Sequence, residues 1–352
     1  MKTIRDFNPK DKTIFIRVDY NVPVKSGKVT SDLRIRASLP TINYLLEHGA
    51  KKIILISHLG RPEGKINLDF TLSPVANTLR KLLPNVKIGF YPLPEKGAEA
   101  KIPADVKIAL LENLRFDPGE ENNDQDFIKN IIDATDADTY VQDGFAVIHR
   151  AHASTDAVKN FLPVYAGLLL ESEVKNLESA TKNPAKPILL IIGGSKVDDK
   201  QPLIDKFATK ADQIFVGGKI AADGYKAKNP RIIVADDFDE DSKGAKLDIG
   251  PLSTAKLAGL ITDAKTVIWN GLLGYAEDPA YATASTITAE VIGEKPTDET
   301  TTIICGGDTT GFVEKLMEDH PSLHYSLVST GGGASLEFLL GKKLPGLEAI
   351  QA

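Results

Sequence analysis

Short apolar runs rich in β-branched residues recur along the whole chain, and segments with helical spacing lie between them. A run of this length bounded by turn residues is typical of a buried strand, whereas apolar residues three and four apart predict a helix. Their alternation predicts βαβ units around parallel sheets. The predicted strands are 13–18, 52–56, 107–111, 187–192, 213–216, 231–234, 266–269, 301–305 and 325–328.

A polar-faced helix is predicted near the middle of the chain, over residues 168–182. Its charged residues include Glu171, Glu173 and Glu178, and the two prolines of segment 183–187 end it. We therefore expect two doubly wound α/β halves joined by a helix, with a ligand cleft between them. One long continuous sheet is the alternative.

Basic and polar residues follow the predicted strands of the first half. Because open α/β sheets bind ligands at the carboxyl ends of their strands, these residues are candidates for one site. Arginine forks match the oxygens of phosphate and carboxylate, and histidines can donate to the same anion. A single arginine is usually solvated and a single histidine structural, but their recurrence at successive strand ends predicts an anion site. The candidates for the anion site are Arg34, His58, Arg61, Arg115, His149 and Arg150. Asp19 and Asn21 could bind hydroxyl groups of a small polar ligand, or they could simply form a turn after the strand.

Glycines follow the predicted strands of the second half, at 193–194, 217–218, 271, 306–307 and 331–333. Glycine lets the backbone approach a phosphate closely, and the amides at the next helix start face the anion. The sequence has neither G-x-x-x-x-G-K-[ST] nor G-x-G-x-x-G, which disfavours those nucleotide-binding families. Asp308 suits a magnesium ion bridging nucleotide phosphates, although a plain helix cap is the alternative.

Composition excludes several classes of protein. A net charge of -6 argues against a broad nucleic-acid or membrane footprint. No apolar run approaches the roughly 18 residues of a membrane span, and the charged N-terminal residues precede no apolar stretch. The single cysteine, Cys305, cannot form an internal disulfide and follows an apolar run, so we expect it in the core. We expect a cytoplasmic protein.

Several strings of residues together resemble one family, the phosphoglycerate kinases. The similarity is collinear from about residue 13 to residue 350. The strings are Arg-Val-Asp-Tyr-Asn-Val-Pro at 17–23, Ser-His-Leu-Gly-Arg-Pro at 57–62, Leu-Glu-Asn-Leu-Arg-Phe at 111–116, His-Arg-Ala-His-Ala-Ser at 149–154, Trp-Asn-Gly at 269–271, Gly-Gly-Asp-Thr at 306–309 and Ser-Thr-Gly-Gly-Gly-Ala-Ser at 329–335.

The resemblance implies reversible phosphoryl transfer between 1,3-bisphosphoglycerate and ADP, a glycolytic step that gives 3-phosphoglycerate and ATP. It also implies a monomer with Mg²⁺ as the nucleotide's metal. The family's chain end returns to the first domain, so the expected triose domain is 1–168 plus 334–352, with segment 341–346 packed there. The expected linker helix is 169–186 and the expected nucleotide domain is 187–333.

The same resemblance assigns roles to individual residues. Arg34, Lys196 and the amides around Gly332 would stabilise charge on the transferring group once the domains close over both substrates, and Asp308 would face the metal. The expected triose-binding residues are Asp19, Asn21, Arg34, His58, Arg61, Arg115, His149 and Arg150. The expected nucleotide-binding residues are Gly194, Lys196, Lys200, Gly217, Asn270, Glu277, Gly306, Gly307, Asp308 and Thr309, with Glu277 as the ribose partner.

The chain departs from the family pattern mainly where the family holds the adenine base. Lys219 and Lys246 replace glycines, Tyr275 replaces a valine, and the stretch between the lysines is shorter than usual. The base preference is therefore less secure than the activity, and the lysines could instead point into solvent. A non-catalytic sensor and another small-molecule kinase or ligase are the alternative functions.

Overall fold

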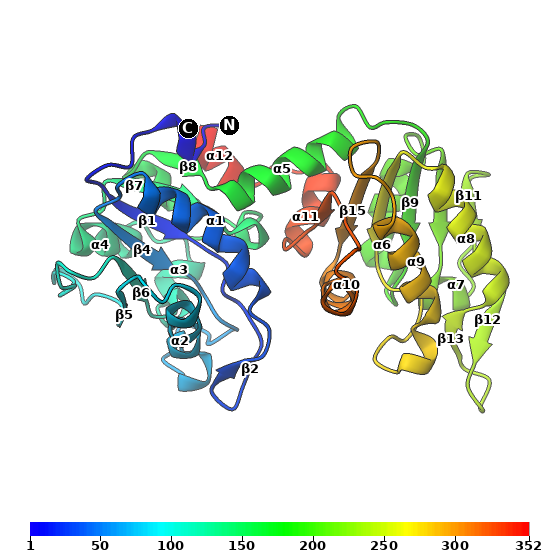
Figure 1. Cartoon of the computed structure of the whole chain (residues 1–352), viewed down its shortest axis with the longest axis horizontal. Helices are drawn as coiled ribbons and strands as arrows, with labels where there is room; N and C mark the ends of the chain where they lie inside the picture. Colours follow the sequence, from blue (N-terminus) through cyan, green and yellow to red (C-terminus); the bar gives the residue numbers. More distant parts are fainter. Residues whose placement is uncertain (352) are drawn as a thin grey trace. The chain divides into compact units, whose positions relative to one another are not determined.

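The computed structural model describes residues 1–351, which form two compact units (Figure 1). Unit 1 consists of Met1–Ser172 and the segment from Lys343 onward, and unit 2 is continuous from Glu173 to Lys342. The division falls inside helix α5 (Leu168–Thr181). Each unit has its own six-stranded sheet, so the predicted class of two parallel α/β sheets is confirmed and the alternative of one continuous sheet is wrong.

The sheet of unit 1 is parallel throughout, in the order β5-β6-β4-β1-β7-β8. Arg17 at the end of β1 aligns with Ile56 of β4 and Gln142 of β7, so the loops after these strands begin at the same edge. The strands are β1 (Thr13–Arg17), β4 (Lys52–Ile56), β5 (Ile88–Tyr91), β6 (Ile108–Leu111), β7 (Thr139–Gln142) and β8 (Val164–Ala166).

Both faces of this sheet are covered. All five residues of β1 are buried, which is typical of a parallel strand with helices on either side. Ile16 belongs to a core shared with helices α1 (Leu33–Glu47) and α2 (Ser73–Leu82). Phe15 points to the opposite face, where its ring meets the edge of Tyr140 with centroids 5.7 Å apart.

The sheet of unit 2 is also parallel, in the order β11-β10-β9-β14-β15-β16. Ile192 aligns with Val216 and Asn270, and Asn270 aligns with Cys305, so four strands finish level. The strands are β9 (Ile188–Ile192), β10 (Gln213–Val216), β11 (Ile232–Val234), β14 (Thr266–Asn270), β15 (Thr301–Cys305) and β16 (Leu327–Val328).

Helices of unit 2 begin almost directly after its strands. Helix α7 (Gly218–Ala222) follows β10 after one residue, and α10 (Gly307–Asp319) follows β15 in the same way. These short connections put helix N-termini at the edge where the strands end. The other α-helices of unit 2 are α6 (Val197–Phe207), α8 (Pro251–Asp263), α9 (Thr283–Gly293) and α11 (Gly333–Leu339). Unit 1 also contains α3 (Pro118–Glu121), α4 (Gln125–Thr135) and α12 (Pro345–Gln351).

Two small antiparallel hairpins lie outside the two main sheets. β2 (Val24–Lys25) pairs with β3 (Lys28–Val29) in unit 1. In unit 2, β12 (Phe238–Glu240) pairs with β13 (Lys246–Ile249), with a register shift after Asp239. The second hairpin packs beside α7, next to the site described below.

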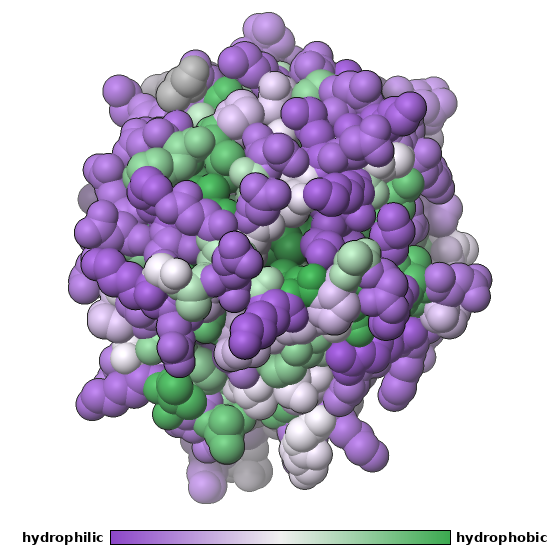
Figure 2. Space-filling view, turned by 90° about the vertical axis from the view of Figure 1, so that its left-hand side faces the viewer, coloured by the Kyte–Doolittle hydropathy of each residue, from purple (hydrophilic) through white to green (hydrophobic). Residues whose placement is uncertain are grey.

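The apolar runs of the sequence are mostly inside the two sheets' cores. Figure 2 shows one face of the molecule, on which hydrophilic residues predominate. Within residues 1–351, every helix is too short or too polar to cross a membrane.

Candidate active site

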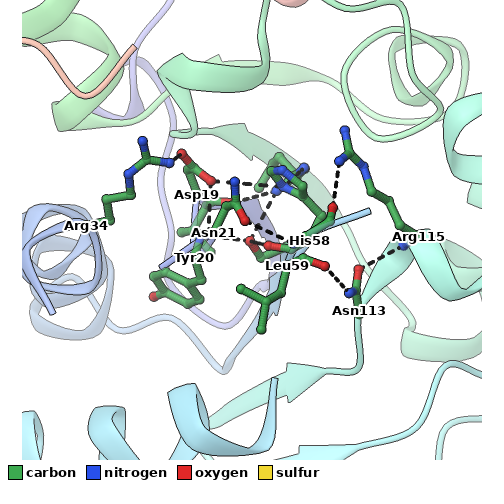
Figure 3. Close-up of polar contacts among 12 residues, drawn as sticks. Asp19, Tyr20, Asn21, Arg34, His58, Leu59, Asn113 and Arg115 are labelled. Carbon is green, nitrogen blue, oxygen red and sulfur yellow. Dashed lines mark hydrogen bonds and ion pairs between the residues drawn. The ribbon is translucent and has the colours of Figure 1, made fainter. Parts of the chain in front are cut away.

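The ends of β1 and β4 and the start of α1 bring Asp19, Asn21, His58 and Arg34 together in unit 1 (Figure 3). The buried Asp19 carboxylate accepts hydrogen bonds from Nη1 of Arg34 and, at 3.1 Å, from the backbone N–H of Asn21. The Asn21 Oδ1 accepts from the backbone N–H of Gly60 at 2.9 Å. Arg34 keeps 32% of its side chain exposed, so its guanidinium remains accessible to a ligand.

Arg17, the last residue of β1, is a functional candidate that sequence reasoning did not identify. Its side chain is buried, its Nε donates to Ser154 Oγ at 2.9 Å, and its Nη2 lies 3.1 Å from His58 Nδ1. A guanidinium can only donate, so Nδ1 of His58 must be the acceptor. The neutral imidazole therefore carries its proton on Nε2.

Ser154 links the buried Arg17 to a buried carboxylate. Ser154 Oγ donates to Glu120 Oε1 at 2.6 Å, and the Ser154 backbone N–H donates to Oε2 at 3.0 Å. Glu120 is completely buried. A cation and an anion buried near each other, each hydrogen-bonded, avoid the large cost of an isolated buried charge. The network thus fixes the position of Arg17 behind His58.

The pKa of His58 lies well below the ordinary value of 6.5. Burial is the largest cause, and the charges of Arg17, Arg115, Arg150 and Arg34 add to it. The positive charges of these four guanidinium groups therefore help to keep the His58 imidazole neutral, and the neutral ring still donates one hydrogen bond. The combination creates a positive field with a donor at its centre, which suits a small anion.

The remaining predicted basic residues differ in how firmly they are held. Arg115 is buried, donates to the backbone carbonyl of Gly60 at 2.9 Å, and lies 3.2 Å from a carboxylate oxygen of Glu121; burial lowers its pKa. Arg150 Nε donates to Nε2 of His149 at 3.2 Å. Across residues 1–351 no polar contact is found for Arg61, whose side chain is exposed beside the Gly60 turn.

A cavity of about 460 Å³ opens in unit 2 where β9, β10, β14 and β15 end. Glycine backbone forms much of its wall, as the clustering of glycines after strands predicted. The predicted nucleotide-binding residues that line the cavity are Gly194, Lys196, Lys200, Glu277, Gly306, Gly307, Asp308 and Thr309.

Close backbone contacts explain why glycine stands at these positions. Gly271 has φ +104°, and a Cβ there would lie 2.2 Å from the carbonyl oxygen of Gly193. The N–H of Gly194 donates to the carbonyl of Leu272 at 2.7 Å, which ties two of the turns together. Gly306 has φ +96°, a conformation that side chains disfavour.

Asn270 and Gly217, two predicted nucleotide-binding residues, lie behind the lining of the cavity. Asn270 is buried, accepts from Nζ of Lys200, and donates to Cys305 Sγ at 3.2 Å. It therefore positions Lys200, whose pKa is lowered by burial. A Cβ on Gly217 would lie 2.7 Å from Leu273, and it is the next residue, Gly218, that lines the cavity.

Cys305 is in the core, as expected. It is completely buried, and burial raises the pKa of its thiol to about 11. A thiol of this kind is a poor nucleophile.

Four carboxylates line the cavity, and two of them stand in the first turns of helices, Asp308 in α10 and Asp199 in α6. Among residues 1–351, no group of three or more histidines, cysteines and acidic residues could hold a metal ion. A magnesium ion here would therefore take most of its ligands from phosphate oxygens and water, which is how nucleotide-bound Mg²⁺ is usually held. The lining carboxylates fit that arrangement.

The hairpin β12–β13 gives the cavity a second, more apolar part. Phe238, Leu247 and Tyr275 line it, together with Lys219 and Lys246. Lys219, Lys246 and Tyr275, at which the chain departs from the family pattern, thus all line the cavity. Nζ of Lys219 donates to Asp223 at 2.7 Å, with 63% of the lysine side chain exposed.

Glu173 corrects the prediction of a polar face on the central helix. It is completely buried, and its carboxylate accepts from Ser329 Oγ at 2.7 Å and from the N–H and hydroxyl of Thr330 at 2.7 and 2.8 Å. It thereby anchors the glycine-rich loop that leads into α11. Gly332 caps that helix with φ +51° and is not among the residues that line the cavity.

An anion site at one parallel sheet and a glycine-lined cavity with lysines and carboxylates at another define a nucleotide-dependent phosphotransferase. The sequence model of the family "Phosphoglycerate kinase" matches residues 4–233 and 226–342. The chain belongs to the phosphoglycerate kinase family, whose members are kinases with a carboxyl group as acceptor.

Individual relatives agree with this family assignment. The chain is 40% identical to phosphoglycerate kinase of Moorella thermoacetica and 38% identical to that of a Roseiflexus species, in alignments covering 99% of this chain and 98% of each relative. Phosphoglycerate kinase structures from Coxiella burnetii and Pyrococcus horikoshii are 34% and 28% identical and have TM-scores of 0.80 and 0.83, over 99% and 100% of this chain and 98% of each of theirs. The two matched segments overlap at residues 226–233, within the stretch between Lys219 and Lys246.

Proposed function

We propose that this chain catalyses the reversible transfer of a phosphoryl group between 1,3-bisphosphoglycerate and ADP, which gives 3-phosphoglycerate and ATP in glycolysis. The observation that carries the proposal is the positive cluster around neutral His58 in a chain of the phosphoglycerate kinase family. Such a cluster suits a ligand with two anionic ends.

Unit 1 is the triose-binding domain in this proposal. Asp19 and Asn21 bind the hydroxyl group, and Nε2 of His58 donates to the anion because its Nδ1 is occupied by Arg17. The arginines and His149 complete the site. The proposed triose-binding residues are Asp19, Asn21, Arg34, His58, Arg61, Arg115, His149 and Arg150.

Unit 2 is the nucleotide-binding domain. Its glycine turns and the N-terminus of α10 bind phosphates, Lys196 and Lys200 supply positive charge, and Glu277 binds the ribose. Asp308 helps to hold Mg²⁺, which neutralises charge on the nucleotide phosphates.

The transfer needs no covalent enzyme intermediate. A β-phosphate oxygen of ADP attacks the acyl phosphorus, the bond from phosphorus to the acyl oxygen breaks, and the carboxylate leaves as 3-phosphoglycerate. Catalysis then consists of positioning and charge stabilisation. Arg34, Lys196 and the amides around Gly332 are the groups we assign to the transferring phosphoryl. A monomer in the cytoplasm is part of the proposal.

A coupled assay of ATP formation from 1,3-bisphosphoglycerate and MgADP tests the proposal. We expect turnover by the wild type and weakened MgADP use by Asp308→Asn, whereas Asp319→Asn at the far end of α10 serves as the matched control and behaves as wild type. Binding of both substrates without turnover would instead support the non-catalytic sensor. Use of a different carboxyl acceptor would support another small-molecule kinase.

A further inference from the structure

The cavity of unit 2 has two parts with different chemistry. The glycine turns and the start of α10 offer amides, which suit phosphate groups. The part beside the β12–β13 hairpin is lined by the aromatic residues Phe238 and Tyr275 and by Leu247. Flat apolar and aromatic walls suit a nucleotide base, because bases stack on such surfaces. If the phosphates occupy the glycine turns, the base lies beside the hairpin.

Lys246 is the distinctive polar residue of this base-binding part. Its Nζ lies 4.4 Å from the centroid of the Phe238 ring, which also lines the cavity. The other lysine there, Lys219, is paired with Asp223. Lys246 takes part in no ion pair within the part of the chain that the structure describes, so its ammonium group can donate to a ligand.

An ammonium group donates hydrogen bonds and cannot accept them. Guanine presents two acceptors, O6 and N7, on one edge, whereas adenine presents N7 beside its N6 amino donor. A lysine at that edge therefore matches guanine better than adenine. Asp248 also lines the cavity, but it is buried and both of its carboxylate oxygens accept backbone N–H groups, from Ile249 at 2.9 Å and from Ala284 at 3.0 Å. Lys246 is therefore the polar side chain that can read the edge of the base.

We propose that the cavity accepts guanine as well as adenine nucleotides, with Lys246 as the residue that donates to the O6 and N7 edge of guanine. The proposal rests on the proposed function and extends its nucleotide substrate. A β-phosphate oxygen of GDP attacks the acyl phosphorus of 1,3-bisphosphoglycerate, the carboxylate leaves, and the products are GTP and 3-phosphoglycerate. No further reactant is needed.

The exposed Tyr275 supports acceptance of more than one base. Just over half of its surface, 52%, is accessible, and its ring lines the cavity. Stacking on a tyrosine contributes similar free energy with any base, since every base has an aromatic face. Tyr275 therefore stacks on either base without discriminating between them, and Lys246 shifts the base preference of the cavity toward guanine.

Initial rates with MgADP and MgGDP, measured for the wild type and for Lys246→Met, test the proposal. Methionine keeps the length of the side chain and removes the donor. Lys243→Met is the matched control, because Lys243 lies in the turn of the same hairpin and does not line the cavity. We expect wild-type kcat/KM for GDP to lie within about tenfold of that for ADP. The ratio of GDP to ADP kcat/KM should fall about tenfold in Lys246→Met, as for loss of one donor contact to guanine, and stay constant in Lys243→Met.

A wild-type preference for ADP above about a hundredfold would overturn the proposal, as would an unchanged nucleotide ratio in Lys246→Met. Absence of turnover with both nucleotides would refute the proposed function instead. In that case calorimetric binding of MgGDP and MgADP to the same variants decides the base preference. An equal loss of affinity for MgGDP and MgADP in Lys246→Met would show that Lys246 has a general electrostatic role, and would contradict its role in discriminating between the bases.

Discussion

At the residue scale, His58 shows how a histidine can be kept from titrating. Arg17 donates to its Nδ1, and burial together with four arginine charges lowers its pKa. A neutral ring with its proton on Nε2 is a hydrogen-bond donor at any physiological pH. In the proposed function, the anion therefore meets fixed charges from arginine and a fixed donor from histidine, so we expect its binding not to depend on the protonation of His58.

The stability of unit 1 should depend on pH through His58. The unfolded chain binds a proton below about pH 6.5 while the folded His58 does not, so the stability is complete above that pH and is lost as the pH falls. We expect the free energy of unfolding to fall between pH 7 and 5, at up to about 1.4 kcal/mol per pH unit from this group.

Urea unfolding at several pH values measures this dependence. His58→Gln should reduce the slope, and His320→Gln, at the exposed end of α10, should leave it unchanged. Identical slopes for the wild type and His58→Gln would mean that His58 is protonated in the folded protein.

Arg34 is the residue whose loss should affect catalysis most directly. Arginines that stabilise a transferring phosphoryl group are worth about 10³ to 10⁵ in rate, so Arg34→Ala should lower kcat by at least about 10³. Arg36→Ala is the matched control, because Arg36 lies on the same helix, pairs with Asp32 and is mostly exposed. Steady-state kinetics measure both variants. If Arg34→Ala kept a tenth of wild-type kcat, the catalytic assignment would be wrong.

At the scale of the element, central helix α5 combines two kinds of glutamate. Glu171 pairs with Arg5 at the surface, whereas Glu173 is buried and anchors the loop before α11. Both look alike in the sequence, because charged residues at helical spacing usually indicate a solvated face. Only the packing of a distant loop, more than 150 residues further on, distinguishes them.

Substitution of these two glutamates should have very different effects on stability. Glu173→Ala leaves the N–H of Thr330 without its carboxylate partner, and we expect a loss of about 2 to 3 kcal/mol in the free energy of unfolding. Glu171→Ala removes an exposed ion pair and should cost less than about 1 kcal/mol. Urea unfolding compares them. Equal losses would contradict the anchoring role of Glu173.

The sequence predicted most strands and missed those with weak patterns. Segments 52–56, 213–216 and 301–305 are strands with the predicted bounds. Three strands of the main sheets were missed: β5, where Gly89 interrupts the apolar run, β7, because Thr139 and Gln142 make its pattern polar, and β8, because it has only three residues. Most of the residues predicted at the strand ends of unit 2 line its cavity, but Gly217, Asn270 and Gly332 are not among the lining residues. The binding roles of all these residues stay predictions. The network of Arg17 and Ser154 could not be predicted, since it joins residues 137 positions apart.

At the scale of the whole molecule, unit 1 is built from two segments that are distant in the sequence. Thr3, near the start of the sequence, forms a parallel β-bridge with Ala166 of β8, and α12 packs near the same strand. The N–H of Gly346 donates to the carbonyl of Ile148 at 2.9 Å. The contact is close, because a Cβ on Gly346 would lie 2.8 Å from that of Ile148.

A methyl group at Gly346 should therefore destabilise unit 1 selectively. Overpacking of this kind costs about 1 to 3 kcal/mol, and hydrogen exchange should increase in β8 and α12 while unit 2 stays protected. Gly259→Ala is the opposite control, because nothing lies within 4 Å of a Cβ at this exposed position of α8. It should stabilise unit 2 by up to about 1 kcal/mol. Uniform exchange changes in both units would show that they do not respond separately.

The interrupted order of unit 1 has a consequence for biosynthesis. A ribosome delivers residues from the N-terminus onward, so the first segment of unit 1 emerges well before α12 can complete it. Unit 2 is uninterrupted and has all its residues available earlier than unit 1 does. Residues translated after unit 2 thus complete a unit that was begun before it, and a chain cut short after Lys342 would lack the helix α12 that packs near β8.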